Sequence, residues 1–311
     1  MAATINGLHH ITAISGSAQR NLDFYARLLG LRFVKKTVNF DDPTVYHLYY
    51  GDQVGTPGTV LTFFPWEQMS RGRPGVGEAS LTAFSVPPGS LSFWRERLER
   101  SGTPVSGPDP RFGEQRLLLE DPDGMPLALV ATEGDERTPW TTGELGPEVA
   151  IRGFAGVTLT LADPGPTAEL LEELFGYRRV GREGATIRYA TPHAPQARIV
   201  DLIEAPGSPR AQLGAGSVHH VAFAVPDRAA QIEVRERLIQ AGHQVTPQID
   251  RNYFYSIYFR TPGGVLFEVA TGEPGFAVDE PVAELGQNLK LPRQHEHRRA
   301  QLERTLPPLR V

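Results

Sequence analysis

Four of the nine histidines occur as two adjacent pairs, in the segments GLHHIT (7–12) and SVHHVAF (217–223). The apolar residues around each pair indicate a β-strand, and neighbouring residues of a strand point to opposite faces of the sheet. One histidine of each pair should therefore face inward. In the second segment the small alanines share a face with His220, which predicts that this face lines a pocket. By the matching position, we expect His10 to be the inward histidine of the first pair.

A single carboxylate, Glu268, lies within the otherwise apolar segment GGVLFEVA (263–270). Such a carboxylate is costly to bury unless it is paired or bound to a cation. With His10 and His220 it makes a set of two imidazoles and one carboxylate, which is typical of non-haem Fe(II) centres with open positions. Mn(II) would fit the same set, whereas a closed structural site would use four ligands. A lone strand histidine is more often a core residue, but two pairs and one carboxylate together favour a metal.

The chain repeats a small unit. The segment from 86 to 105 resembles that from 225 to 245, since both contain a helix with RERL, and 121–132 resembles 261–271. These repeats predict four β-α-β-β-β modules, at about residues 5–66, 79–132, 150–205 and 217–271. We assign the modules to an N-terminal domain (1–145) and a C-terminal domain (146–275), followed by a tail (276–311). The predicted fold is α+β, with the four βαβββ modules forming two cupped, half-open mixed-sheet barrels around a pocket.

The modules differ at the positions of the proposed ligands. Four residues after the glycine that opens the last strand, the first module has Thr62, the second has Ala128 and the fourth has Glu268. The third module lacks this glycine turn, so its alignment stays open. The first strands of the second and third modules carry no histidine. The metal ligands are therefore expected from the first and fourth modules alone.

The composition is that of an average globular protein: 311 residues, 40% hydrophobic, 22% charged, with a net charge of −5. No apolar run approaches the ~20 residues that span a bilayer, and the N-terminus has no secretory pattern. We therefore expect a cytoplasmic protein that binds neither membrane nor, without a Lys/Arg block, nucleic acid. The absence of cysteine excludes disulfides and thiolate ligands. A homo-oligomer stays open, as does a tail that caps the pocket or makes a dimer contact.

Several segments together resemble the ring-cleaving dioxygenases of the vicinal oxygen chelate (glyoxalase/bleomycin resistance/dioxygenase) superfamily: GLHHIT, YHLYYGD, GTPGTVLTFFPW, SVHHVAFAVPD and YFRTPGGVLFEVAT. The resemblance runs nearly end to end and is greatest to the branch that opens hydroquinones, including methyl- and chloro-substituted ones. In that branch the ligands are the second histidine of each pair and the glutamate of the last strand. The resemblance thus implies His10, His220 and Glu268, in one site shared by the first and fourth modules.

The resemblance also implies residues that contact the substrate or move protons near the metal. Thr12 lies two residues after His10 and hence on the same strand face. The implied set is His9, Thr12, His219, Arg251 and Tyr258. The remaining histidines receive no role: His47, His193, His243, His295 and His297. Three aromatic residues, Phe63, Phe254 and Phe267, are expected in the core.

The implied reaction is the Fe(II)-dependent opening of a hydroquinone-type (para-dihydroxy) aromatic ring by O₂. Tyr258 or a non-ligand histidine would move protons, and Arg251 would stabilise negative charge. A glyoxalase-type isomerase or lyase would need a second carboxylate, which Thr62 does not provide, although Asp201 or Glu204 could substitute. A catechol extradiol dioxygenase would take its ligands from the C-terminal half alone. A non-enzymatic aromatic-binding protein would lack the triad.

Overall fold

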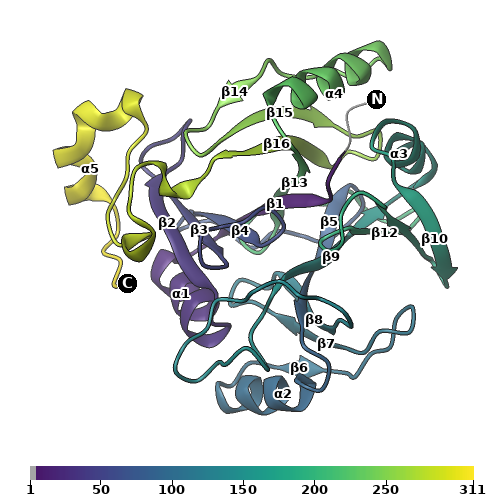
Figure 1. The fold of residues 1–311 in the computed structure, drawn as a ribbon, viewed down its shortest axis with the longest axis horizontal. Helices are drawn as coiled ribbons and strands as arrows, with labels where there is room; N and C mark the ends of the chain where they lie inside the picture. The colour runs from purple at the N-terminus through teal and green to yellow at the C-terminus, as the bar shows by residue number, and fades with distance from the viewer. Residues whose placement is uncertain (1–4) are drawn as a thin grey trace.

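The structure, a computed structural model, describes residues 5–311 and contains two eight-stranded mixed sheets (Figure 1). Four β-α-β-β-β modules are present in chain order, as the repeats predict. The first module comprises β1 (Leu8–Ser15), α1 (Ala18–Leu22) continued by the π-helical η1 (Asp23–Leu28), β2 (Arg32–Val38), β3 (Tyr46–Gly51) and β4 (Val60–Pro65). The second comprises β5 (Glu78–Val86), α2 (Leu91–Arg100), β6 (Val105–Ser106), β7 (Arg116–Glu120) and β8 (Pro126–Ala131).

The second half of the chain repeats the order of the first. The third module comprises β9 (Gly153–Leu161), α3 (Gly165–Glu169) continued by η2 (Leu170–Leu174), β10 (Arg178–Glu183), β11 (Thr186–Ala190) and β12 (Ile199–Glu204). The fourth comprises β13 (Val218–Val225), α4 (Arg228–Gln240), β14 (Ile249–Asp250), β15 (Phe254–Arg260) and β16 (Leu266–Pro274). The tail contains the 3₁₀ turns η3 (Phe276–Val278), η4 (Val282–Glu284) and η5 (Arg293–Arg298), then α5 (Arg299–Thr305).

Each sheet combines one module from either half of the chain. The first sheet has the order β14-β15-β16-β13-β1-β4-β3-β2 and is joined where β1 pairs antiparallel with β13. The second has the order β10-β11-β12-β9-β5-β8-β7-β6 and is joined where β5 pairs antiparallel with β9. Both strands that carry a histidine pair therefore lie side by side in one sheet. The division into domains at 145/146 stays a prediction, since both sheets draw strands from either side of it.

The turn before each module's last strand sets the register of that strand. Gly58, Gly124 and Gly264 all have φ near +90°, a conformation that L side chains rarely adopt. In the third module Ala197 takes the same place with φ +52°, so the turn that the sequence seemed to lack is present. Four residues on, the equivalent positions are occupied by Thr62, Ala128, Asp201 and Glu268.

Helix α4 shows why one face of β13 is bulky and the other small. The Asp227 side chain accepts a hydrogen bond from the amide of Ala230 at 2.8 Å and so caps the helix N-terminus. The helix buries Val234 and Leu238 in the hydrophobic cluster that also contains Val221, Phe223 and Val225 of β13. The bulky face of β13 thus packs in the core, as predicted, and His220 is on the other face. In Figure 1, α4 covers β15 and β16 at the top of the molecule.

The tail packs along β2 and supports the first module. The Lys35 side chain is fully buried, with Nζ 2.6 Å from Asp279 Oδ1 and 2.5 Å from Glu280 Oε2. A further strand-like contact joins Lys36 to Leu289. In Figure 1 the tail, in yellow, lies on the β2 side of the molecule, with α5 at its outer edge. Because the tail contacts its own chain here, it braces one end of the first sheet.

No helix in the described part of the chain is long and apolar enough to cross a membrane.

We expect Lys35→Ala to lower the free energy of unfolding by about 3 kcal/mol or more, because it leaves the buried Glu280 carboxylate without its cation. Urea unfolding followed by circular dichroism measures the change. Lys290→Ala, which removes a lysine of the tail that has no buried carboxylate partner among the described contacts, should change stability by less than about 1 kcal/mol. Equal effects of the two substitutions would contradict the proposed anchoring of the tail.

Candidate metal centre

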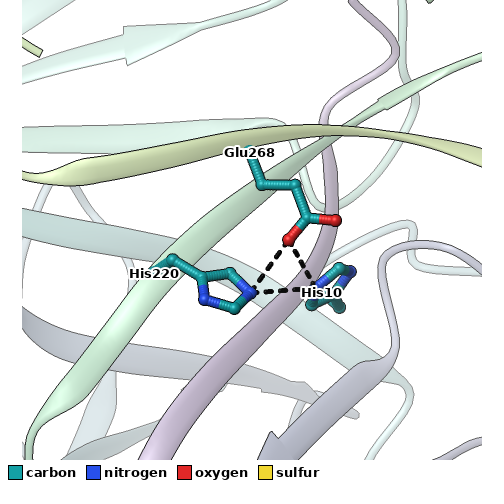
Figure 2. A group of neighbouring side chains, drawn as sticks. All are labelled: His10, His220 and Glu268. Atoms are coloured by element: carbon teal, nitrogen blue, oxygen red, sulfur yellow. Dashed lines mark hydrogen bonds and ion pairs between the residues drawn. The ribbon is translucent and has the colours of Figure 1, made fainter. Parts of the chain in front are cut away.

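The side chains of His10, His220 and Glu268 converge on one buried point (Figure 2). The two Nε2 atoms of the histidines lie 3.3 Å apart. Glu268 Oε2 lies 3.2 Å from His10 Nε2 and 2.9 Å from His220 Nε2. The exposed fractions of the three residues are 2%, 5% and 0%, respectively. His10 thus meets two residues that lie more than two hundred positions away in the sequence.

These spacings fit a metal ion. Two ligand atoms each about 2.1 Å from an ion and at right angles to one another lie about 3.0 Å apart. The three measured separations are close to this value, so the donors would occupy three mutually adjacent positions and leave the opposite side open. Glu268 Oε2 is buried and lacks a hydrogen-bond partner among the described residues. A buried carboxylate oxygen of this kind needs a cation, and the two neighbouring nitrogens are the ligands that would share it.

Strand pairing explains how the three residues meet. Strand β13 lies between β1 and β16, so the three strands that carry the triad are consecutive. His10 is paired with Ala222, and Ala222 is paired with Glu268. The β1–β13 ladder shifts register at both His9 and His219, which makes each an extra residue in its strand. Both histidine pairs thus sit at β-bulges, which redirect side chains and relax the strict alternation expected from the sequence.

The first histidine of each pair contacts the second. His9 Nε2 lies 3.0 Å from the carbonyl oxygen of Thr271 and must donate to it, so a neutral His9 has a bare Nδ1. This Nδ1 is 2.9 Å from His10 Nδ1, which therefore carries its proton there and leaves Nε2 free to bind a metal. His219 Nδ1 is likewise 2.8 Å from His220 Nδ1. The Ser256 hydroxyl donates to Glu268 Oε1 and holds the carboxylate.

The protonation states suit metal binding. Burial lowers the pKa of His9 and of His219 to about 3, and it also lowers the pKa of His220. Burial alone would raise the pKa of Glu268, but attraction to His10 and His220 outweighs it, and the net pKa is well below the usual range. At neutral pH the centre therefore offers a neutral His220 imidazole and an ionised Glu268 carboxylate, which are the forms that bind metals.

A cavity of about 260 Å³ lies beside the triad. This volume suits a ligand of about one aromatic ring, since sites for larger molecules exceed ~300 Å³. Its walls combine aromatic rings with a few polar groups. The lining residues are His10, Asn39, Phe40, Asp41, His47, Tyr49, Phe64, Trp66, His219, His220, Arg251, Phe254, Tyr258 and Leu266.

The structure distributes the residues implied by the resemblance over two layers. His219, Arg251 and Tyr258 line the cavity, where Arg251 Nε donates to the Tyr258 hydroxyl at 3.2 Å. Burial and the nearby Glu268 raise the pKa of Tyr258, so its phenol stays protonated. His9 lies behind His10, as described above. Thr12 is fully buried and accepts a hydrogen bond from the Thr62 hydroxyl at 2.9 Å.

Several lining residues received no role from the sequence. His47 was given no role, yet its ring lines the cavity with Tyr49. The strand YHLYYG that carries both has aromatic residues on both faces, so its pattern does not show which face meets the metal. Phe254 lies in a hydrophobic cluster, as expected, and it also forms part of the cavity wall, with its ring centroid 4.9 Å from that of His10. Phe63 and Phe267 lie in the hydrophobic core, as expected.

The second sheet has no equivalent centre among its described residues. Asp201 is at the position that corresponds to Glu268, but the Arg188 guanidinium occupies the space in front of it through two contacts of 2.9 Å. Arg188 also contacts Glu114 Oε2 at 2.6 Å. Asp201 and Glu204 belong to β12 of this sheet, so neither joins the His10 centre. In the first sheet, the position of β4 that is equivalent to Glu268 is occupied by Thr62, which is not an acidic ligand.

Comparisons with known proteins place this fold and site in a family. The model of the Glyoxalase/Bleomycin resistance protein/Dioxygenase superfamily matches residues 7–129 and 153–269, so the chain belongs to this superfamily. The resemblance seen in the sequence is thereby confirmed. A solved structure from Bacillus subtilis strain 168, described as a "putative dioxygenase", superposes with a TM-score of 0.96 at 47% identity and covers 100% of this chain and 99% of its own. Maize glyoxalase I, at 14% identity and a TM-score of 0.63, covers 86% of this chain and 92% of its own, and shares the fold.

Two curated relatives are similar over nearly the whole length. The Bacillus subtilis protein named "Putative ring-cleaving dioxygenase MhqO" is 47% identical over 100% of this chain and 99% of its own. The "Chlorohydroquinone/hydroquinone 1,2-dioxygenase" of Sphingobium indicum is 38% identical over 97% of this chain and 96% of its own.

We expect His10→Ala, His220→Ala and Glu268→Ala each to abolish metal retention, because two remaining donors hold an ion much more weakly than three. Protein loaded with Fe(II) without oxygen, then desalted, can be assayed for iron by atomic absorption. His297→Ala, which changes an exposed tail histidine, serves as the control and should retain the wild-type amount. Stoichiometric iron in all three triad variants would show that the ion binds elsewhere.

We also expect the metal-free protein to lose stability as the pH falls from about 6.5 toward 3. Over this interval the unfolded chain binds protons on histidines, at an ordinary pKa of about 6.5, that the folded chain keeps neutral. The contribution is fully present above about pH 6.5 and declines below it. Urea unfolding at several pH values measures the slope, which should be smaller for His219→Gln. Stability that stays constant on acidification would contradict neutral buried histidines.

Proposed function

We propose that this protein is a ring-cleaving dioxygenase that uses Fe(II), held by His10, His220 and Glu268, to open a hydroquinone-type aromatic ring with O₂. One observation carries the proposal: three mutually adjacent donor atoms face a cavity the size of one aromatic ring. The names of the relatives support the reaction class, and the Sphingobium indicum relative supports hydroquinones as the substrate class. Mn(II) is the second metal that this ligand set would accept.

The bound ion would supply neighbouring open positions for a ring oxygen and O₂ and electronic coupling between them. The protein's own residues then orient and protonate. His9 and His219 hold the ligand imidazoles, and their neutral state keeps extra positive charge away from the metal. The aromatic walls confine the ring and exclude water, which strengthens each polar contact.

Arg251 and Tyr258 have different proposed roles toward the substrate. Tyr258 accepts from Arg251 Nε and is also hydrogen-bonded to Ser256, and we propose that it donates its proton to a substrate oxygen when the substrate is bound. Arg251 can stabilise negative charge that develops on the ring or on oxygen. Its carboxylate contact, Asp41 Oδ2 at 3.6 Å, is at an exposed side chain and leaves much of this charge uncompensated.

The rival reactions fit the geometry less well. A glyoxalase-type isomerase would need a second acidic ligand, but Thr62 stands beside the triad and Asp201 is held by Arg188 in the other sheet. A catechol extradiol enzyme would take its ligands from the C-terminal half, whereas His10 comes from β1. An aromatic-binding protein without chemistry would not need the converging donors.

We expect protein reconstituted with Fe(II) to consume one O₂ per hydroquinone, and His220→Ala to lose at least about 100-fold in rate. An oxygen electrode, with hydroquinone, catechol and a hemithioacetal in parallel, distinguishes the candidates. Isomerisation of the hemithioacetal without O₂ uptake would instead support the glyoxalase reaction. Faster O₂ uptake with catechol than with hydroquinone would support extradiol cleavage and contradict the proposed substrate class.

A further inference from the structure

A chain of hydrogen bonds runs from the cavity into the first sheet through side chains outside the triad. The Tyr49 hydroxyl lies 2.7 Å from His47 Nδ1, and His47 Nε2 lies 2.8 Å from Thr62 Oγ1. The Thr62 hydroxyl in turn donates to Thr12 Oγ1 at 2.9 Å. Tyr49 and His47 line the same cavity as His10. These hydrogen bonds therefore join the cavity wall to Thr62, which occupies in the first module the position that is equivalent to Glu268 of the fourth.

The direction of each hydrogen bond in this series can be assigned by starting from its last member, the bond from Thr62 to Thr12. Since the Thr62 proton is used on Thr12, the Thr62 oxygen must accept from His47, so His47 carries its proton on Nε2. Burial holds the pKa of His47 well below its usual range, and the ring is neutral. A neutral imidazole with its proton on Nε2 has a bare Nδ1. The Tyr49 hydroxyl must therefore donate to His47.

This arrangement fixes the hydrogen-bonding role of the Tyr49 phenol. The Tyr49 proton is turned toward His47, so its oxygen presents lone pairs to the cavity and can only accept. Tyr258, in contrast, accepts from Arg251 Nε and is also hydrogen-bonded to Ser256. Burial raises the pKa of Tyr49 well above its usual range, so Tyr49 stays a neutral phenol. The cavity thus offers the Tyr49 oxygen as a hydrogen-bond acceptor.

Packing holds the Tyr49 acceptor in place. The His47 ring lies between Tyr49 and Phe64, with centroid distances of 4.1 and 4.4 Å. On its other side Tyr49 contacts Phe276 of the tail at 5.1 Å. Tyr49 is itself 3% exposed. A side chain confined in this way cannot turn its oxygen elsewhere without disturbing the aromatic cluster.

We propose that Tyr49 is a specificity-determining residue that accepts a hydrogen bond from a ring hydroxyl not bound to the metal, with His47, Thr62 and Thr12 as positioning residues. The inference rests on the proposed function and identifies what the site selects: a ring with two hydroxyls, one for the metal and one that stays protonated. A site built to bond a hydroxyl strongly disfavours analogues that lack it, because its own buried polar atom is then left unpaired.

Anaerobic calorimetry of the Fe(II)-loaded protein tests the inference without turnover. The ligands are hydroquinone and 4-fluorophenol, which offers one metal-binding oxygen and no second hydroxyl. Wild type should bind hydroquinone about tenfold or more tightly than 4-fluorophenol, as expected for one buried hydrogen bond. In Tyr49→Phe this ratio should fall to about two, the statistical value for two equivalent hydroxyls. An unchanged ratio in Tyr49→Phe would overturn the proposal.

A second pair of variants tests the positioning chain and covers the case in which Tyr49→Phe fails to fold. Thr62→Val leaves the His47 Nε2 proton without an acceptor and so favours the other tautomer, which donates to Tyr49 and turns the Tyr49 proton into the cavity. The ligand ratio should then fall at least threefold (about 0.7 kcal/mol). Thr62→Ser keeps the hydroxyl and should keep the ratio. A full ratio in Thr62→Val, or equal loss in both variants, would contradict the chain.

Oxygen uptake by the same wild-type preparation separates the two hypotheses. If wild type prefers hydroquinone in binding but consumes no O₂, the proposed function fails and the recognition by Tyr49 stands. If wild type consumes O₂ with hydroquinone but the ratio does not depend on Tyr49, the function stands and the inference fails. Iron content, measured for each variant, shows that the ratios compare equally loaded proteins.

Discussion

The site depends on the buried carboxylate of Glu268, which has one oxygen, Oε2, without a hydrogen-bond partner among the described residues. Glu268 is fully buried in an apolar strand, and its Oε2 faces only the two imidazole nitrogens of the triad. Burial of a charge is tolerated when a cation shares the site. Consecutive strands, two bulges and the contacts of His9 and His219 all serve to keep three donor atoms about this one point.

The four modules show how one scaffold can hold or lose such a site. All four turn into their last strand at the same position, but Glu268 is replaced by Thr62, Ala128 and Asp201. In the second sheet the Arg188 guanidinium is an internal cation for Asp201, which makes a metal unnecessary there. In the first sheet Thr62 brings a hydroxyl to the position where the fourth module has a carboxylate, and this hydroxyl belongs to a hydrogen-bond chain that reaches the cavity.

Much of this could be predicted from the sequence, because the repeats allow residues at equivalent positions of the modules to be compared. The modules, the choice of His10 and His220, and the isolated Glu268 follow from alternation and from differences between equivalent positions. The bulge that also brings His219 to the cavity does not follow from them. The pairing of the first module with the fourth does not, since long-range strand pairing leaves no local pattern, and it came from the family resemblance. The turn at Ala197 was missed because an alanine rarely adopts φ +52°. His47 was missed because its role depends on the direction of three hydrogen bonds.

The most direct test is the position of the metal itself. Crystals grown anaerobically with Fe(II) and measured near the iron absorption edge should show one strong anomalous peak, about 2.1 Å from His10 Nε2, His220 Nε2 and Glu268 Oε2. A peak at another place, or fully ordered triad side chains with no peak in protein that retains iron, would contradict the central claim that these three residues hold the ion.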